Sequence, residues 1–440
     1  MEMDHDEYKL LFAPILAKEE IASILSPYGF KDIPKADNNI QLIAGDPLQR
    51  KVFAIFFIHL LKILGESPDP DMALNNMEKY IRNVASPVSL FSFFANNLKP
   101  LEILILILSH SQFFSDIICI NTTYFDWLFE SKNIGIAKTS ADFSYDINEM
   151  LKSVKSFEKK TNILRIFKRR EILRIGVNDL IDALSQEAVM RQISLLAETL
   201  LEAAYQISKE ELQLTYGIPK TPHKEEADFC IISMGKLGGE ELNYSSDIDI
   251  IFIYSDDGEV ENTDKKSQNI ISNLDFFTKL AEMIIRHISN ITDEGYCFRV
   301  DTRLRPDGKS GQLVRSLESM EKYYYSHGET WERQALIKAR VAAGDRKLGK
   351  TFLKKIDGFI YRKYLDYQAI QEIKMLKNRI EQEVDKKELF EREVKLGYGG
   401  IRDIEFTVQF LQLLHGGENE ILKNTNTLTT LKNLFIGINL

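Results

Sequence analysis

Cysteine is scarce in this sequence. Only three occur among 440 residues, Cys119, Cys230 and Cys297, and no two of them form a C-x-x-C pair. An odd and sparse count argues against a disulfide framework and against a structural zinc site. The seven histidines are also scattered, without the spacing of metal ligands. These absences predict a protein whose thiols stay reduced.

Long apolar runs are missing as well. The most apolar stretches, residues 54–61 and 103–108, are far shorter than the about 20 residues that a membrane-spanning helix needs. The first seven residues are acidic and lack the apolar centre of a signal peptide. Together with the scarce cysteines, this pattern predicts a cytoplasmic protein that has no membrane partner.

The sequence has no excess of positive charge. Lysine and arginine number 56 against 65 acidic residues, so the net charge is -9. Binding to nucleic acid generally requires a broad basic face. The charge balance therefore argues against nucleic acid as a partner, and any phosphate chemistry is expected in a local basic pocket.

Most of the chain has the pattern of helices. The dipeptides Asp46-Pro47 and Asp69-Pro70 each place an N-cap before a proline, which predicts the start of a helix. A different pattern follows residue 220, where apolar runs at 229–234, 249–254 and 296–304 predict three strands. The fold class we predict is α+β and predominantly α-helical, with a small mixed sheet embedded between helical regions.

The length of 440 residues predicts two or three domains. We place an N-terminal helical region at 1–155, the α/β core with its leading helices at 156–316, and a C-terminal helical bundle at 317–440. From Leu317 the helical pattern is expected to persist to the C-terminus. Residues 427–440 end without a cap or a breaker, which predicts an excised fragment of a longer chain.

The residues that carry chemistry lie between and after these strands. Asp247 and Asp249 open the second strand, and residues two apart on a strand point to the same face. Two adjacent carboxylates repel each other unless a cation lies between them, and hard oxygen ligands suit Mg²⁺. A third carboxylate, Asp301, lies in the third strand. If that strand is a neighbour of the second, the three acids form a two-metal site; an ion pair with the nearby arginines is the alternative reading of Asp301.

A local supply of phosphate-binding groups surrounds these acids. The glycine turn before the second strand offers backbone N–H groups, and Lys236 adds a positive charge. Arg303 and Arg305 follow Asp301 and can hold phosphate oxygens in bidentate fashion.

A glycine turn, an Asp-x-Asp pair and a distant third aspartate resemble the nucleotidyltransferase superfamily typified by DNA polymerase beta. A closer resemblance is to the bifunctional glutamine synthetase adenylyltransferase/adenylyl-removing enzyme. It runs from about residue 160 to about 415. The matching segments are 167–174, 235–249, 300–306, 331–333 with 338–340, and 399–406.

That family joins two related halves: the N-terminal half removes AMP from a tyrosine of glutamine synthetase, and the C-terminal half adds it. Residues 242–247 and Arg402 resemble the removing half, since the adding half tends to have glycine where Asn243 and Ser245 stand. Only one Asp-x-Asp constellation of this kind occurs in the chain. The resemblance therefore implies an adenylyl removase, in which inorganic phosphate attacks the AMP phosphorus and ADP leaves.

The resemblance also implies the ligands and partners. Mg²⁺, with Mn²⁺ as an alternative, would be the cofactor, and glutamine synthetase the protein substrate. The PII signal protein would be a regulator, and adenine nucleotide and inorganic phosphate would be small-molecule partners. The implied residues are the metal-binding Asp247, Asp249 and Asp301, with Lys236, Gly238, Gly239, Ser246, Arg303 and Arg305 around the phosphates.

Two other functions stay open. One is an ATP-dependent adenylyltransferase that acts on a protein or small-molecule acceptor. The other is a non-catalytic module that binds glutamine synthetase or PII, against which the three intact aspartates argue. Some roles stay open too: the helix that carries Arg165 is a solvated basic face, a contact with substrate or a contact with the core. Lys338 and Arg340 are candidates to reach the site, and residues 402–405 either close over the nucleotide or are structural.

Overall fold

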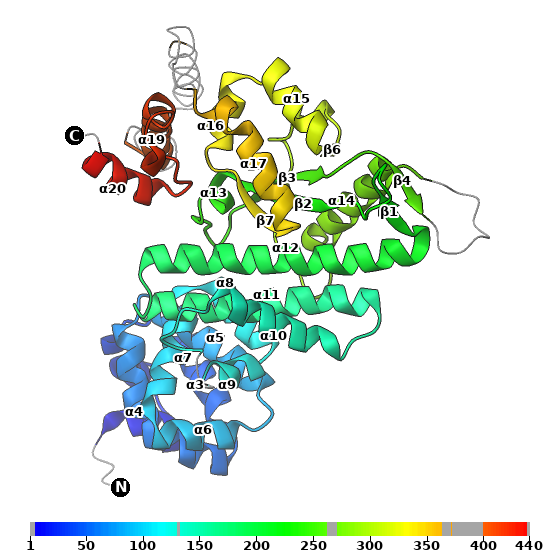
Figure 1. Ribbon diagram of the computed structural model, residues 1–440. Coiled ribbons are helices and arrows are strands. Elements are labelled where there is room, and N and C mark those ends of the chain that lie inside the picture. The colour runs from blue at the N-terminus through cyan, green and yellow to red at the C-terminus, as the bar shows by residue number, and fades with distance from the viewer. Residues whose placement is uncertain (1–4, 130–132, 262–270, 363–370, 372–398, 438–440) are drawn as a thin grey trace. The chain divides into compact units, whose positions relative to one another are not determined.

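The computed structural model describes residues 5–129, 133–261, 271–362, 371 and 399–437. Contacts within the chain divide it into two compact units, each described here by itself (Figure 1). Unit 1 comprises Met1–Ala137 and Arg169–Val189, and unit 2 comprises Lys138–Lys168 and Met190–Leu440.

Among its described residues, unit 1 is built of helices. Asp46 accepts hydrogen bonds from the amides of Leu48 and Gln49 at 2.8 and 2.9 Å, and Pro47 is the first residue of the helix that follows. Asp69 caps the next helix in the same way, so both predicted helix starts are confirmed. The helices are α1 (Lys9–Phe12), α2 (Lys18–Leu25), α3 (Ile33–Ala44), α4 (Pro47–Glu66), α5 (Pro70–Asn83), α6 (Pro87–Asn96), α7 (Leu98–His110), α8 (Gln112–Ile120) and α9 (Thr123–Leu128).

Among the described residues no single helix has the length and apolarity to cross a membrane. Helices α6 and α7 meet that test only as a pair, and they are bent by 115° at the break between them.

Three further helices precede the sheet of unit 2 in the sequence. They are α10 (Ser140–Lys152), α11 (Phe157–Leu180) and α12 (Gln186–Tyr216). On α11, Arg165 is only 3% exposed and donates to the carbonyls of Asn290 and Gly295. Of the readings of this basic helix, contact with the core is therefore the one that holds at Arg165.

A five-stranded mixed sheet forms the centre of unit 2, and the predicted fold class is confirmed. Its strand order is β5-β3-β2-β7, and β6 also pairs with β3. Strand β2 is antiparallel to β3 and β7, whereas β5 and β6 run parallel to β3. The strands are β2 (Phe229–Met234), β3 (Ile248–Tyr254), β5 (Val300–Asp301), β6 (Val314–Ser316) and β7 (Arg340–Gly344), and a separate pair is formed by β1 (Ile218–Lys220) and β4 (Glu259–Glu261).

Unit 2 has further helices. They are the one-turn α13 (Gly235–Gly238), α14 (Asn273–Ser289), α15 (Leu317–His327), α16 (Thr330–Leu336), α17 (Arg346–Ile360), α19 (Ile401–His415) and α20 (Thr427–Gly437). Of these, α14 lies on one face of the sheet and α15 and α17 on the other.

Two predictions about the sheet are wrong in detail. The third strand spans only Val300–Asp301 and not 296–304, because the chain leaves the sheet at a turn directly after Asp301. The helical pattern expected from Leu317 onward is broken by β7, whose alanine-rich sequence has no strong strand preference of its own. Pairing with β2 makes it a strand. The parts of that stretch at 363–370, 372–398 and 438–440 lie outside the described residues.

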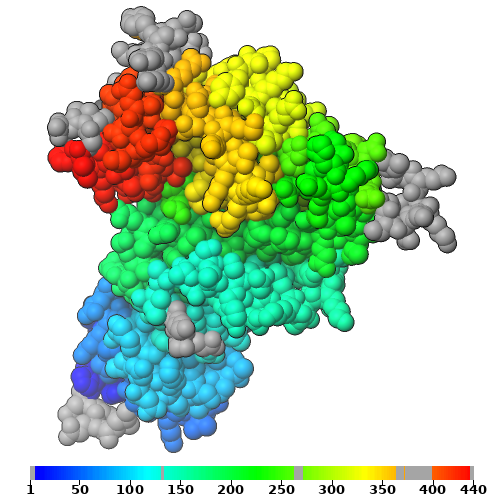
Figure 2. Space-filling view, viewed as in Figure 1, coloured from blue at the N-terminus to red at the C-terminus, as the bar shows by residue number. Residues whose placement is uncertain are grey.

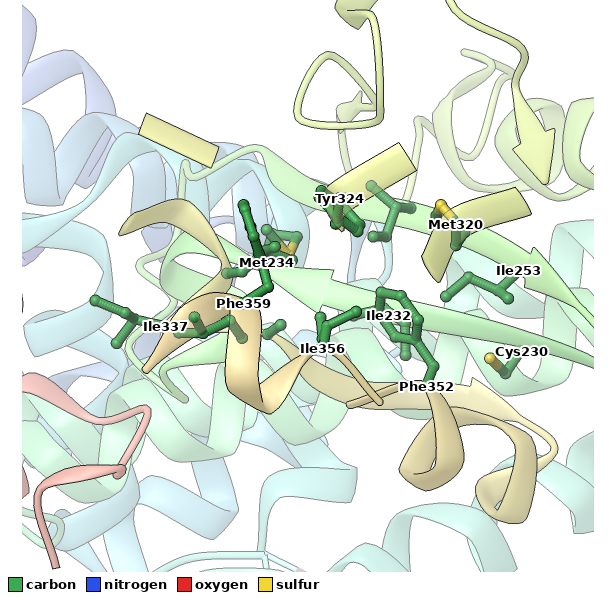
Figure 3. Close-up of a cluster of buried hydrophobic side chains, with 14 of the residues drawn as sticks. Cys230, Ile232, Met234, Ile253, Met320, Tyr324, Ile337, Phe352, Ile356 and Phe359 are labelled. Atoms are coloured by element: carbon green, nitrogen blue, oxygen red, sulfur yellow. The ribbon is translucent and has the colours of Figure 1, made fainter. Parts of the chain in front are cut away.

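Both faces of the sheet are buried. All six residues of β2 are buried, as a strand covered by helices on each side requires. On one face Phe229 stacks on Tyr205 of α12 and Phe277 of α14, with ring centres 5.7 and 5.4 Å apart. On the other face Ile232 and its neighbours pack against α15 and α17, as Figure 3 shows. This packing leaves only the strand ends accessible to a substrate.

The three cysteines are buried and are not joined to one another. Burial raises the pKa of Cys119 to about 11 and that of Cys297 to about 12. Both thiols therefore stay protonated and unreactive near neutral pH.

A half-buried histidine on α14, His287, predicts sensitivity to acid. Burial, and then the nearby Arg165 and Arg286 cations, lower the pKa of His287 from 6.5 to about 4. The folded state thus holds a neutral imidazole that the unfolded chain protonates more readily. The contribution of this group to the free energy of unfolding is fully present above pH 6.5 and falls as the pH falls towards 4. At pH 5 the loss is about 2 kcal/mol.

We therefore expect the fall in the free energy of unfolding between pH 7 and pH 5 to be about 2 kcal/mol smaller in His287→Gln than in the parent chain. Urea denaturation at both pH values measures it. His223→Gln, which removes a histidine from a turn near β1, serves as the control. An equal pH dependence in parent and His287→Gln would contradict the assignment.

Candidate active site

The site is built at the turn between β2 and β3. Gly235 begins the turn with a φ of +52°, a left-handed conformation that favours glycine. A Cβ added at Gly235 would lie 2.5 Å from Oδ2 of Asp249, so the missing side chain leaves room for this carboxylate. Gly238 has a different reason to be glycine, because a Cβ there would lie 1.7 Å from the carbonyl oxygen of Lys338.

Strand register brings the acidic residues together. Asp249 on β3 is the direct parallel partner of Asp301 on β5, so the predicted neighbouring strands are present. Asp247 directly precedes β3, two residues before Asp249. The three carboxylates share one end of the sheet and one cavity, which has a volume of about 630 Å³.

Arginines bind two of these carboxylates. Arg303 donates to Asp301 from its backbone N–H at 2.8 Å and from its guanidinium group. These bonds hold the pKa of Asp301 below its usual range, so the group is ionised at neutral pH. Arg299 pairs in the same way with Asp247 and also donates to the carbonyl of Ser245 at 2.7 Å.

Six of the nine residues predicted for the site line the cavity. They are the three aspartates with Lys236, Ser246 and Arg303. Gly238 and Gly239 are buried behind the turn, outside the cavity lining. Arg305 is also outside it: its guanidinium donates to the carbonyls of Thr302, Lys309 and Gly311 at 2.8 to 3.1 Å and so holds the loop after β5 together.

Several cavity residues were not assigned from the sequence. Gly235, Asn243 and Ser245 lie on the recognised turn between the first two strands, and Arg299 is one of the arginines of the predicted third strand. Helix α19 adds Ile401, Arg402, Glu405 and Gln409, and of these only Arg402 and Glu405 had a signal, the preceding Gly-Gly turn.

The two basic candidates near β7 differ. Lys338 lines the cavity and pairs with Glu241 at 2.6 Å and with Glu405 at 2.9 Å. Arg340 instead pairs with Glu198 on α12 and donates to the carbonyls of Leu237 and Gly238, outside the cavity lining. It therefore fixes the glycine turn against α12.

The donor set fits a hard divalent cation in its chemistry. Three carboxylates at one strand end are the oxygen ligands that Mg²⁺ and Mn²⁺ prefer. In the arrangement described, however, two of them are engaged by arginines. Within the described residues no group of three or more acidic, histidine or cysteine side chains is close enough together to hold a metal ion. Both carboxylate oxygens of Asp301 accept from Arg303, so a metal ion bound there would compete with this guanidinium group.

A glycine turn, an Asp-x-Asp pair at the start of the next strand and a third aspartate on the parallel neighbour define a nucleotidyltransferase core. Residues 101–355 match the glutamate-ammonia ligase adenylyltransferase family. The chain belongs to this family. Residues 370–436 match a second family, GlnD PII-uridylyltransferase.

Curated relatives are similar to part of the chain. The bifunctional glutamine synthetase adenylyltransferase/adenylyl-removing enzyme of Hahella chejuensis is 39% identical over 291 residues, which is 66% of this chain and 30% of the relative. The proteins of the same name from Vibrio parahaemolyticus and Pseudomonas aeruginosa are each 41% identical over 62% of this chain. The chain spans less than a third of the length of these relatives.

The packing of Gly235 against Asp249 yields a prediction. Gly235→Ala should lower the free energy of unfolding by about 1–3 kcal/mol, because it adds left-handed strain to a close contact with the carboxylate. It should also weaken Mn²⁺ binding, measured by titration calorimetry, about tenfold or more, since Asp249 must move.

Gly308→Ala is the matched control. It has a similar φ of +58°, but its nearest atom would be 3.8 Å away, so it should show the backbone cost alone and unchanged Mn²⁺ binding. Equal Mn²⁺ affinities in both variants would show that the space at Gly235 does not position Asp249.

Proposed function

We propose that this chain is an adenylyl removase that acts on adenylylated glutamine synthetase. One observation carries the proposal: the register of β3 with β5 places Asp249 beside Asp301, and Asp247 lies in the same cavity. Membership of the adenylyltransferase family and the names of the relatives support this class of chemistry. Asn243 and Ser245, which resemble the removing half, line the cavity and favour removal over addition.

The proposed reaction is a phosphorolysis. An oxygen of inorganic phosphate forms a bond to the AMP phosphorus, and the bond from phosphorus to the tyrosine oxygen breaks. The products are ADP and tyrosine, whose phenolate takes up a proton. Phosphate is anionic near neutral pH and tyrosine has a reference pKa of about 10, so no strong general base is required. Alignment and charge neutralisation are the main demands on the site.

The residues divide these tasks. Asp247, Asp249 and Asp301 would hold Mg²⁺, or Mn²⁺ as the alternative. The bound metal supplies neutralisation of the phosphate charge. Lys236 and Arg303 line the same cavity and would bind phosphate oxygens, with Ser246 as a further donor. We propose that Gly238, Gly239 and Arg305, which lie outside the cavity lining, shape the turn and the loop that carry these groups.

The family name makes an adenylyltransferase the second candidate, because the same cavity could hold ATP and transfer AMP to an acceptor. The partners that follow from the first candidate are glutamine synthetase as substrate and the PII protein as regulator. Neither partner's binding surface is assigned.

A phosphorolysis assay tests the proposal. With adenylylated glutamine synthetase, phosphate and Mg²⁺, the chain should form ADP, identified by chromatography. Asp249→Asn should lower the rate by well over the roughly 10–100-fold that loss of an outer-shell metal partner costs, with unchanged folding. Asp293→Asn, on an exposed turn, should be as active as the parent chain.

The alternatives give different products. AMP in place of ADP would indicate hydrolysis. AMP transfer from ATP to unmodified glutamine synthetase, without ADP formation from the modified form, would favour the second candidate. Near-normal ADP formation by Asp249→Asn would contradict the assignment of the three carboxylates.

A further inference from the structure

Lys338 is a buried cation at the boundary of the cavity. It follows α16 and precedes β7, and only 4% of its surface is exposed. Its Nζ bonds to Oε2 of Glu241 at 2.6 Å and to Oε1 of Glu405 at 2.9 Å. Glu241 belongs to the glycine turn, whereas Glu405 belongs to α19, so one ammonium group connects two separate walls of the site.

Other polar bonds join the same two walls. The side-chain amide of Asn426 donates to the carbonyl of Gly239 at 2.9 Å. The backbone N–H of Thr427, at the start of α20, donates to Glu241. Gln334 of α16 donates to Gln409 of α19 at 2.9 Å. Figure 2 shows the C-terminal segment, in red, lying against the surface of α16 and α17, in orange.

These polar bonds connect the segments that the two family matches cover. Glu241 and Lys338 lie within residues 101–355, and Glu405 and Thr427 lie within residues 370–436. The second match therefore covers a separate segment that completes the cavity of the first. Helix α19 supplies Arg402 and Gln409 to the lining, opposite residues that come from the sheet segment.

Among the described residues, apolar contacts also hold this segment. Helix α19, α20 and the turn between them share a small core of their own, in which Val408, Leu422 and Leu434 meet. Leu413, with Phe410 beside it, reaches the main core next to the sheet. Hydrogen bonds and ion pairs are directional, so the polar bonds add a constraint on the orientation of α19.

We propose that Lys338 is a positioning residue that fixes α19 against the glycine turn, so that Arg402 and Gln409 face the three carboxylates. It acts through Glu241 and Glu405 and not by contact with the substrate. The inference deepens the proposed function, on which its kinetic test rests; its structural test does not depend on that function.

Hydrogen exchange provides the structural test. Glu405→Gln keeps the size of the side chain and removes its charge, so it weakens the bond from Lys338. Amide exchange in 401–415 should become at least about tenfold faster, while exchange in β2 and β3 stays unchanged. Lys338→Met should give a larger increase in the same segment. Where Lys338→Met does not fold, Glu405→Gln decides.

Kinetics provide the second test. Glu405→Gln should raise the KM for phosphate about tenfold and change kcat by less than about threefold. The Kd for Mn²⁺ should stay within about twofold of the parent value. Glu321→Gln and Lys355→Met break a matched pair, 2.5 Å apart on α15 and α17, and should change neither exchange in 401–415 nor kinetics.

The proposal fails if exchange in 401–415 is unchanged in Glu405→Gln, or if kcat falls while KM and exchange stay constant. Those results would mean that Lys338 acts on the substrate or on the fold in general. If the parent chain forms no ADP, the proposed function is wrong. The positioning role of Lys338 is still tested by the exchange measurement, which does not depend on that function.

Discussion

The hydrogen-bonded register between β3 and β5 is the constraint on which the site depends. Parallel pairing sets Asp249 directly beside Asp301, although 52 residues separate them in sequence. A shift of one residue would turn one of these side chains to the opposite face of the sheet. Backbone hydrogen bonds hold this register: the N–H of Ile248 donates to the carbonyl of Arg299 at 2.9 Å, and β3, to which β5 pairs, is fixed in the buried sheet. The core thus sets the geometry of the carboxylates.

The carboxylates in turn need a counter-charge. Bringing three acids to one strand end is unfavourable unless cations balance them. In this structure Arg303 and Arg299 supply that charge to Asp301 and Asp247. Both arginines line the cavity, and under the proposed function Arg303 would also bind phosphate oxygens. This explains how a chain with a net charge of -9 can hold a local site for anionic substrates.

The sequence predicted those parts of the structure that depend on local patterns. The Asp-Pro helix starts, the buried strand 229–234 and the Asp-x-Asp pair follow from neighbouring residues, and the structure agrees. Strand β7 could not be found, since Arg340–Gly344 becomes a strand only through its partner β2. Part of the lining from α19 could not be found for the same reason: Arg402 and Glu405 follow a recognisable Gly-Gly turn, but Gln409 has no local signal and reaches the cavity only through tertiary packing. The packing role of Gly238, which is set by the Lys338 carbonyl, is likewise invisible in sequence.

The proposed metal site comprises Asp247, Asp249 and Asp301, and in this structure Arg299 pairs with Asp247 and Arg303 with Asp301. Anomalous diffraction from crystals of this chain soaked in Mn²⁺ tests it most directly. The account predicts a manganese peak bonded to oxygens of these three aspartates, with the Arg303 guanidinium no longer on Asp301. A peak at other residues, or no peak while Arg303 stays bonded to Asp301 at saturating Mn²⁺, would contradict it.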